Sequence, residues 1–431
     1  MIFNYRRVIF KTLDFLRENL IRRNIVEIEN TINSDHSTIK AYQKRKIVQL
    51  LEYSVNNVPY YNNLEQTDIS DFPVIDKNIY KKNIGSFCSD LFKTEKLYKT
   101  VTSGSTGTPF VSYQTKEKRI RNTADTIFFS EEVFFSLGQA LVYMKIWNNV
   151  NKKNIISQFI QNIIPVNVLN LSDRNISELL KKLTSKKTIS ILGYSSALEA
   201  IARYIERDKI RIGFTVNTII SMSEALDSKT KKLIENAFDC KVYSRYSNVE
   251  NGILAQQCNK SDQDFVINSA SYYIEILKFN SDYPVKDGGI GRIVVTDLFN
   301  YGMPFIRYDT GDIGAKTTRI IKGKEVEVFT KIEGRKMDAI FNTKGELISS
   351  FTITNSMWSY EELDQYQFIQ VGSKEYLFRL NVKKPFLKGD KLIKEFREYL
   401  GNDALINIEY VDEIPLLDSG KRKKVMNLWI A

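Results

Sequence analysis

A loop at 101–110, VTSGSTGTPF, carries the residue types best suited to holding a phosphate. A β-like run enters this loop of glycine and small hydroxyl residues, and a second β-like run leaves it. Backbone N–H groups and hydroxyls donate hydrogen bonds to phosphate oxygens, while glycine permits close approach and positive φ. We therefore predict a phosphate-binding loop, with an ordinary flexible loop as the alternative. It is not a Walker A loop, because no Gly-Lys-Ser/Thr follows at the required spacing. The candidate residues are Thr102, Ser103, Gly104, Ser105, Thr106 and Gly107.

Five further segments place charged or aromatic side chains after predicted strands or near the end of the sequence. They follow the loop in this order: TIISMSEAL with Glu224, KVYSRYSNVENG with Tyr246 and Glu250, MPFIRYDTGDIG with Asp309 and Asp312, GRKMD at 334–338, and IPLLDSGKRKKV with Lys421. Any one segment could arise by chance, but six in this order hardly could.

Alternating strands and helices are expected to position these segments. Short β-branched or aromatic runs separated by amphipathic stretches occupy 97–300 and predict a layered α/β sheet. The expected strands are 97–101, 110–113, 141–146, 189–193, 215–221, 240–244 and 292–297, and the expected helices are 176–185, 196–207 and 227–238. A strand at 326–333 precedes a new set of strands and one helix near 388–400. We expect a large layered α/β domain at 1–333 and a small, mobile α+β domain at 334–431.

The N-terminal segment 1–60 predicts two helices separated by a polar stretch at 29–46. The first helix is amphipathic and basic. We expect its apolar stripe to pack on the protein's own core, with peripheral contact to a membrane surface as the alternative. His36, the single histidine, is expected in a turn.

The composition excludes several classes of protein. Apolar residues make up 43% and charged residues 26%, as in soluble globular proteins. No apolar run approaches the ~20 residues that cross a bilayer. Three dispersed cysteines and one histidine disfavour a disulfide framework, a metal centre and histidine-based catalysis. No signal-peptide features are present, so we expect a cytoplasmic protein. The net charge of +11 favours anionic partners, but without a nucleic-acid-binding signature we expect no nucleic acid among them.

With its six segments in order, the sequence resembles the adenylate-forming superfamily of acyl-CoA synthetases, luciferases and peptide-synthetase adenylation domains. Within that superfamily it is similar to the phenylacetate-CoA ligase branch and its capsule-biosynthesis, CapK-like members. The similarity to this branch is carried by LLEYSVNNVPYYNNL at 50–64, FPVIDKNIY at 72–80 and GGIGRIVVTDLFNYGMPFIRYDTGD at 288–312. It spans nearly the whole chain, from about 45 to 425.

The resemblance implies that ATP activates a small carboxylic acid as an acyl-adenylate, with release of pyrophosphate, and that the acyl group then passes to a thiol, usually that of coenzyme A. It assigns 102–108 to the β- and γ-phosphates, Glu250 to Mg²⁺, and Tyr246 to stacking on adenine. Asp312 would accept hydrogen bonds from both ribose hydroxyls. The other residues that the resemblance implies at the site are Glu224, Ser247, Asn248, Arg335, which would approach the ribose or phosphate, and Lys421, which would swing in from the small domain to neutralise the transition state.

The sequence departs from the family pattern at two positions. Val249 stands where threonine is usual, which leaves the α-phosphate contact open, with Asn248 as a candidate. Met337 stands where the first acid of an Asp-Asp pair is usual, which leaves Asp338 as the expected hinge. Considered one by one, the residues have structural alternatives: a core aromatic for Tyr246, a turn residue for Asp312 and a solvated basic run for Lys421.

Three functions are compatible with these observations. The first is acid activation followed by thioester formation with coenzyme A. The second keeps the adenylate but transfers the acyl group, without coenzyme A, to an amine or hydroxyl of a glycan or carrier in surface-polysaccharide biosynthesis. The third is a nucleotide-binding protein without turnover. Which acid is used does not follow from the sequence.

Overall fold

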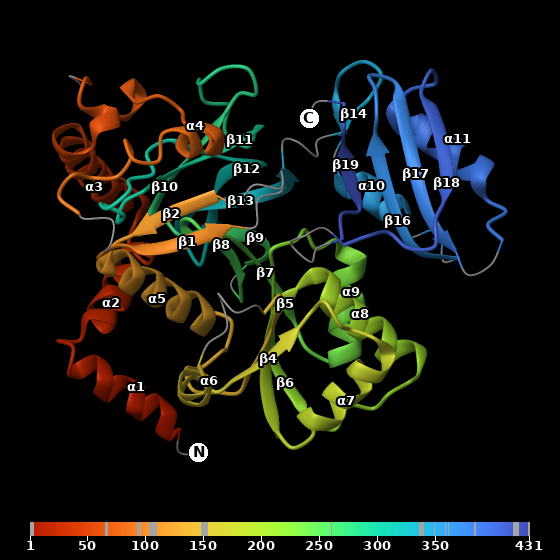
Figure 1. Ribbon diagram of the computed structural model, residues 1–431, viewed down its shortest axis with the longest axis horizontal. Coiled ribbons are helices and arrows are strands. Elements are labelled where there is room, and N and C mark those ends of the chain that lie inside the picture. Colours follow the sequence, from red (N-terminus) through yellow and green to blue (C-terminus); the bar gives the residue numbers. More distant parts are fainter. Residues whose placement is uncertain are drawn as a thin grey trace.

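A single large sheet organises most of the chain (Figure 1). The structure is a computed structural model. It describes residues 4–64, 68–92, 96–102, 110–147, 154–259, 261–335, 340–348, 350–357, 359–360, 362–382, 385–416 and 422–429. Among these residues, eleven strands form the large sheet in the order β10-β11-β12-β13-β9-β8-β7-β6-β5-β3-β4.

One half of this sheet is parallel and covered by helices. Its strands are β3 (Leu141–Lys145), β4 (Ile163–Asn167), β5 (Thr188–Tyr194), β6 (Thr215–Met222) and β7 (Val242–Asn248), and helices α7 (Asp173–Leu183), α8 (Ser195–Arg207) and α9 (Ser228–Phe238) lie between them in sequence. Apolar residues of these strands and helices form one buried cluster that includes Ile191, Leu198 and Ile234. The predicted alternation over this region is confirmed, with bounds that differ by a few residues.

The other half of the sheet is antiparallel and continues from β7. It consists of β8 (Gly252–Cys258), β9 (Ser261–Ile267), β10 (Tyr272–Leu277), β11 (Ile290–Asp297), β12 (Tyr308–Ile321) and β13 (Lys324–Arg335). A separate hairpin is formed by β1 (Tyr98–Thr102) and β2 (Phe110–Gln114), in which Thr102 lies opposite Phe110. The helices α4 (Lys77–Lys82), α5 (Lys116–Glu131) and α6 (Ile155–Gln161) follow the early loops and strands.

The N-terminal segment contains three helices within residues 4–64, so the prediction of two helices is wrong. They are α1 (Tyr5–Phe15), α2 (Leu20–Ile32) and α3 (His36–Asn57). Most of the stretch expected to separate two helices is itself helical, because Asp35 accepts a hydrogen bond from Thr38 N (2.9 Å) and starts α3 there. His36 is consequently the first residue of a helix and not part of a turn.

The first helix does not bury its apolar stripe, which corrects the second expectation for this segment. Tyr5, Ile9, Leu13 and Leu16 are all exposed. Instead the polar side of α1 faces the protein, because the Asp14 side chain accepts hydrogen bonds from the first N–H groups of α2.

The C-terminal part forms a smaller unit with its own core. Its elements are β14 (Ile340–Phe341), β15 (Leu347–Ile348), α10 (Ser350–Met357), β16 (Leu363–Gln370), β17 (Glu375–Val382), α11 (Gly389–Leu400), β18 (Leu405–Tyr410) and β19 (Val425–Asn427). The four-stranded sheet has the order β18-β17-β16-β19, and buried residues such as Phe368, Phe378 and Phe396 pack on it. The expected α/β class, with a large sheet domain and a smaller C-terminal unit, is confirmed. The boundary between 333 and 334 stays a prediction.

In the described parts of the chain, no helix has the length and apolar character needed to cross a membrane.

Candidate functional site

The end of β7 and the start of β12 bring Tyr246 and Asp312 together. The Tyr246 hydroxyl donates a hydrogen bond to Asp312 Oδ2 (2.7 Å). The Tyr246 ring also packs edge-on against Phe329, with 5.8 Å between ring centroids. Burial, together with the Asp312 charge, raises the pKa of Tyr246 well above its usual value, so the phenol stays protonated and keeps donating. Two segments that the sequence analysis selected separately therefore meet in one place.

Glu250 lies in the turn after β7 and is almost fully buried. Its Oε1 accepts a hydrogen bond from the Tyr308 hydroxyl (2.8 Å) and lies 3.9 Å from Lys77 Nζ. Its backbone oxygen accepts a hydrogen bond from Gln114 Nε2 (2.9 Å), at the end of the β1–β2 hairpin. The turn that carries Glu250 is thus held against the last residue of β2.

Lys77 reaches this site because the chain before α4 pairs with the start of β12. Ile75 forms a parallel bridge with Tyr308. Ile75 N donates to Arg307 O, and Asp309 N donates to Ile75 O, both at 3.0 Å. Lys77 Nζ also lies 5.0 Å from the centre of the Phe110 ring. Sequence reasoning missed Lys77 and Tyr308 as site residues, although both lie in segments that carried the family resemblance.

Several expected site residues lie partly or wholly outside the described residues. Thr102 is the last residue of β1, while 103–107 and Lys421 are not described. Met337 and Asp338 are likewise not described. For Arg335, only the backbone is described, and it lies opposite Asp312 in the β12–β13 pairing.

The other three expected residues have identified places. Across β7–β8, Ser247 pairs with Ile253 and Asn248 pairs with Gly252. Asn248 Oδ1 accepts a hydrogen bond from Asn251 N (2.8 Å) and so shapes the turn that carries Glu250. Glu224 follows β6 and binds the start of α8, where its two carboxylate oxygens accept hydrogen bonds from Ser196 N (2.7 Å) and Ser196 Oγ (3.0 Å).

A buried ion pair supports the Glu250 turn through Tyr272. Lys118 Nζ lies 2.6 Å from Asp297 Oδ2, and both side chains have zero exposure. Lys118 Nζ also donates to the Tyr272 hydroxyl (3.0 Å), which in turn donates to Asn251 O (2.6 Å). The backbone next to Glu250 is therefore connected through Tyr272 to α5.

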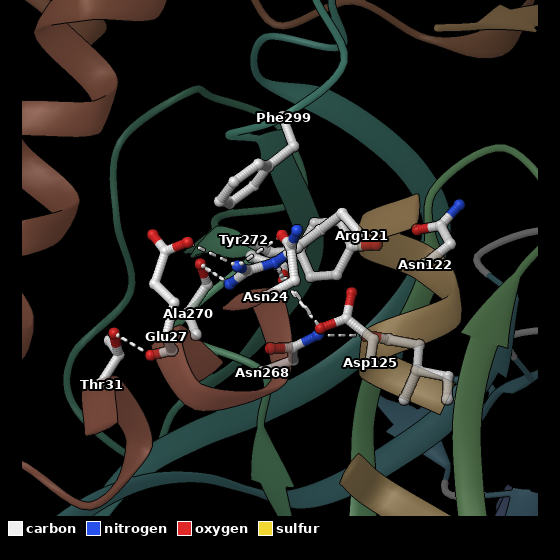
Figure 2. A network of polar contacts seen from close by, with 12 residues as sticks. Asn24, Glu27, Thr31, Arg121, Asn122, Asp125, Asn268, Ala270, Tyr272 and Phe299 are labelled. Carbon is white, nitrogen blue, oxygen red and sulfur yellow. Dashed lines mark hydrogen bonds and ion pairs between the residues drawn. The ribbon is translucent and has the colours of Figure 1, made fainter. Parts of the chain in front are cut away.

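The same helix contributes a second buried cation, Arg121 (Figure 2). Its guanidinium donates to Ala270 O (2.8 Å), to Ser271 Oγ (2.8 Å) and to Glu27 Oε2 (3.1 Å), and it stacks over Phe299 at 4.0 Å. The α2 helix, α5 and the turn before β10 are joined by these contacts. Nothing in the local sequence marks this network, because its members are polar residues far apart in the chain.

Among the site residues, Glu250 is the carboxylate that suits Mg²⁺. No group of three or more metal-binding side chains occurs in the part of the chain that the structure describes. Mg²⁺ often binds through one or two carboxylates and completes its shell with phosphate oxygens and water. A single buried carboxylate fits that mode, so Glu250 has the chemistry of a suitable ligand.

Several known proteins are similar to this chain. A family model described as the CapK C-terminal domain matches residues 340–428. Protein CapK of Staphylococcus aureus is 23% identical over 456 aligned residues, which cover 99% of this chain and 98% of CapK. The phenylacetate-coenzyme A ligase of Escherichia coli (strain K12) is 21% identical over 396 residues, covering 80% of this chain and 82% of the ligase.

Solved structures share the fold. The structure of 2-hydroxyisobutyryl-CoA ligase in the postadenylation state, in complex with R3-HIB-AMP, has a TM-score of 0.71 at 15% identity and covers 92% of this chain and 90% of its own. ATP-bound MatB from Rhodopseudomonas palustris has a TM-score of 0.57 at 14% identity, covering 78% of this chain and 68% of its own.

The fold is that of adenylate-forming enzymes. The chain is similar to CapK-like proteins, through both its C-terminal part and its full-length likeness to CapK. The resemblance stated for the sequence is thereby confirmed.

Proposed function

We propose that this protein is a ligase that activates a small carboxylic acid with ATP, forms an acyl-adenylate and pyrophosphate, and transfers the acyl group to coenzyme A. The observation that carries the proposal is the meeting of Tyr246, Asp312 and Glu250 beside the β1–β2 hairpin. Likeness to acyl-CoA ligase structures and to a phenylacetate-coenzyme A ligase supports it. A cytoplasmic location is part of the proposal.

The residues act on ATP as follows. Asp312 accepts hydrogen bonds from the ribose hydroxyls, while Tyr246 holds the carboxylate and lies beside the adenine. Residues 102–108 bind the β- and γ-phosphates. Lys77 lies between Glu250 and Phe110 and places a positive charge where β2 begins. Lys421 brings a second positive charge to the phosphorus as the acid's oxygen attacks.

Glu250 would hold Mg²⁺, and the ion would supply positive charge that neutralises the negative charge developing on the phosphates. Tyr308 keeps the Glu250 carboxylate in place through its hydrogen bond to Oε1. Because Glu250 is buried, its orientation is fixed before the nucleotide arrives, which reduces the cost of reorganisation during the reaction.

A second function is favoured by one observation, the full-length likeness to Protein CapK. In that case the acyl-adenylate forms in the same way, but the acceptor is an amine or hydroxyl of a glycan or carrier, and coenzyme A is not used.

The test is pyrophosphate release, measured with ATP and a panel of aryl, fatty, hydroxy and amino acids, followed by mass detection of an acyl-CoA. We expect acid-dependent release, which Lys421→Ala reduces by roughly 10²–10³, the scale for losing one group that stabilises transition-state charge. The matched control is Lys423→Ala, a change in the same basic run, which is expected to retain activity.

Each outcome assigns the function. Acyl-CoA formation supports the first proposal, and adenylate formation without acyl-CoA supports the CapK-type role. ATP binding without pyrophosphate release for any acid contradicts both and points to a nucleotide-binding protein. Full activity of Lys421→Ala contradicts the assigned role of that lysine.

A further inference from the structure

The α1 helix presents its apolar stripe to solvent, which is unusual for a helix of a globular protein. Tyr5, Ile9, Leu13 and Leu16 follow one another at helical spacing along one side, and their exposed fractions are 43%, 41%, 43% and 73%. Phe15, beside this stripe, is 68% exposed. Isolated exposed apolar residues are normal, but a continuous row of large ones indicates an interaction surface.

The outward orientation of this stripe is fixed by polar contacts on the opposite side of the helix. Asn4 Nδ2 donates to Leu137 O (2.9 Å), and Arg7 pairs with Glu131 (3.4 Å). Gly138 allows this approach, since a Cβ at that position would lie 2.5 Å from Asn4 Oδ1. The helix is thus attached through its polar side, and rotating the stripe inward would break these contacts.

A second exposed apolar group lies next to α1 on α6, and the two helices are neighbours at one edge of the molecule (Figure 1). Ile155, Ile156 and Phe159 have exposed fractions of 84%, 70% and 62%. Arg6 links the helices, since its Nε donates to Phe159 O (2.9 Å) and its guanidinium lies 4.9 Å from the Phe159 ring centre. We call the exposed apolar side chains of α1 and α6 the α1–α6 patch.

The segment that carries α1 is rich in basic residues. Residues 4–23 contain six basic side chains, namely Arg6, Arg7, Lys11, Arg17, Arg22 and Arg23, against the acidic Asp14 and Glu18. The Asp14 carboxylate accepts hydrogen bonds from Ile21 N and Arg22 N (both 3.0 Å). Its negative charge therefore faces the start of α2 and not the solvent. Arg7 is paired with Glu131, but the other five basic side chains still exceed the one remaining acidic side chain, Glu18. The N-terminal segment therefore combines an exposed apolar stripe with an excess of positive charge.

We propose that the α1–α6 patch inserts into the headgroup region of a lipid bilayer rich in anionic lipids. An exposed amphipathic helix with basic residues at its margin is complementary to such a surface in both polarity and charge. A second copy of this chain fits less well, because a symmetric contact would bring two basic margins together. This surface is separate from the proposed catalytic residues and would hold the enzyme at a membrane.

The test is co-sedimentation of the full chain with vesicles of phosphatidylcholine alone or mixed with phosphatidylglycerol. We expect binding to the mixed vesicles that weakens about ten-fold when salt rises from 0.1 to 0.5 M. The combined change Ile9→Ser, Leu13→Ser and Leu16→Ser should lower the partition coefficient on the order of 100-fold, because three large apolar side chains no longer enter the lipid.

The matched control replaces three exposed apolar residues elsewhere, Tyr283, Ile320 and Leu387, by serine, and it should bind like the parent. A second variant, Arg17→Gln with Arg22→Gln and Arg23→Gln, tests the charge without touching the stripe and should bind about ten-fold or more weakly. Thermal unfolding checks that all variants fold.

Four results would overturn the proposal. These are no binding of the parent chain to anionic vesicles, equal binding by the stripe variant, an equal loss in the control, or a parent dimer in sedimentation velocity that the stripe variant abolishes. The last result would assign the patch to a second copy of the chain.

Discussion

Two tyrosines, the buried Tyr308 and the partly buried Tyr246, hold the two carboxylates of the candidate site. Tyr246 donates to Asp312, and Tyr308 donates to Glu250. Sequence reasoning selected both carboxylates because they lie in recognisable segments that follow strands. It could not select Tyr308 or Lys77, because their approach to Glu250 depends on the bridge between Ile75 and Tyr308, which no local pattern reveals.

The buried Tyr308 hydroxyl should make the free energy of unfolding depend on pH in the alkaline range. Burial, and then the Glu250 charge, raise the pKa of Tyr308 well above its usual value, so the folded protein keeps the phenol neutral while the unfolded chain ionises near pH 10. The stability from this group is complete below about pH 10 and is lost as the pH rises, by about 1.4 kcal/mol per pH unit. In Tyr308→Phe, the loss of unfolding free energy per pH unit should be smaller by about the 1.4 kcal/mol that one tyrosine contributes.

Urea unfolding between pH 8 and 11 measures the slope. The control is Tyr283→Phe, at a tyrosine that is 72% exposed, and its slope should match that of the parent. An unchanged slope in Tyr308→Phe would show that this phenol is not held neutral by the fold.

At the scale of elements, α5 carries two buried cations, of which Lys118 supports the Glu250 turn through Tyr272. Lys118 and Arg121 lie one turn apart on this helix, and both are fully buried. The sequence predicted the alternating strands and helices over 97–300 because their hydrophobic periods are strong. It did not predict this polar core, because partners of buried charges are chosen by tertiary packing and not by spacing along the chain.

Removing the ammonium of Lys118 should be costly. In Lys118→Met, Asp297 is left buried without its cation, and the free energy of unfolding should fall by about 3–5 kcal/mol. The matched control is Lys374→Met, which breaks an exposed pair with Asp403 and should cost at most about 1 kcal/mol. Urea denaturation compares the two variants, and equal losses would contradict a structural role for the buried pair.

At the scale of the whole molecule, the C-terminal unit touches the large sheet domain through an ion pair. Lys424 Nζ, next to β19, lies 2.9 Å from Glu199 Oε2 on α8. Burial raises the pKa of Glu199, but the charges of Lys424 and Arg203 lower it by more, so the carboxylate is ionised at neutral pH. This contact stabilises one orientation of the C-terminal unit relative to the sheet.

Removing the ion pair between Lys424 and Glu199 should raise the fraction of molecules in which the C-terminal unit is detached from α8. For Glu199→Gln we expect tryptic cleavage after Arg335 or Lys336 to accelerate about five-fold, because a partly buried ion pair contributes about 1 kcal/mol. Glu178→Gln, which breaks an exposed pair with Arg174 on α7, should leave the rate unchanged. Equal cleavage rates for Glu199→Gln and the parent would show that the contact does not restrain the unit.

The pairing of Asp312 with Arg335 connects the proposed ribose site to the start of the C-terminal unit. Arg335 ends the strand from which the chain leaves for the C-terminal unit, and Asp312 is the carboxylate proposed to grip the ribose. A rotation of the C-terminal unit would act on the β12–β13 pairing that also holds Asp312, the residue proposed to bind the ribose. Release of the nucleotide product and rotation of the C-terminal unit would then be coupled through this strand pair.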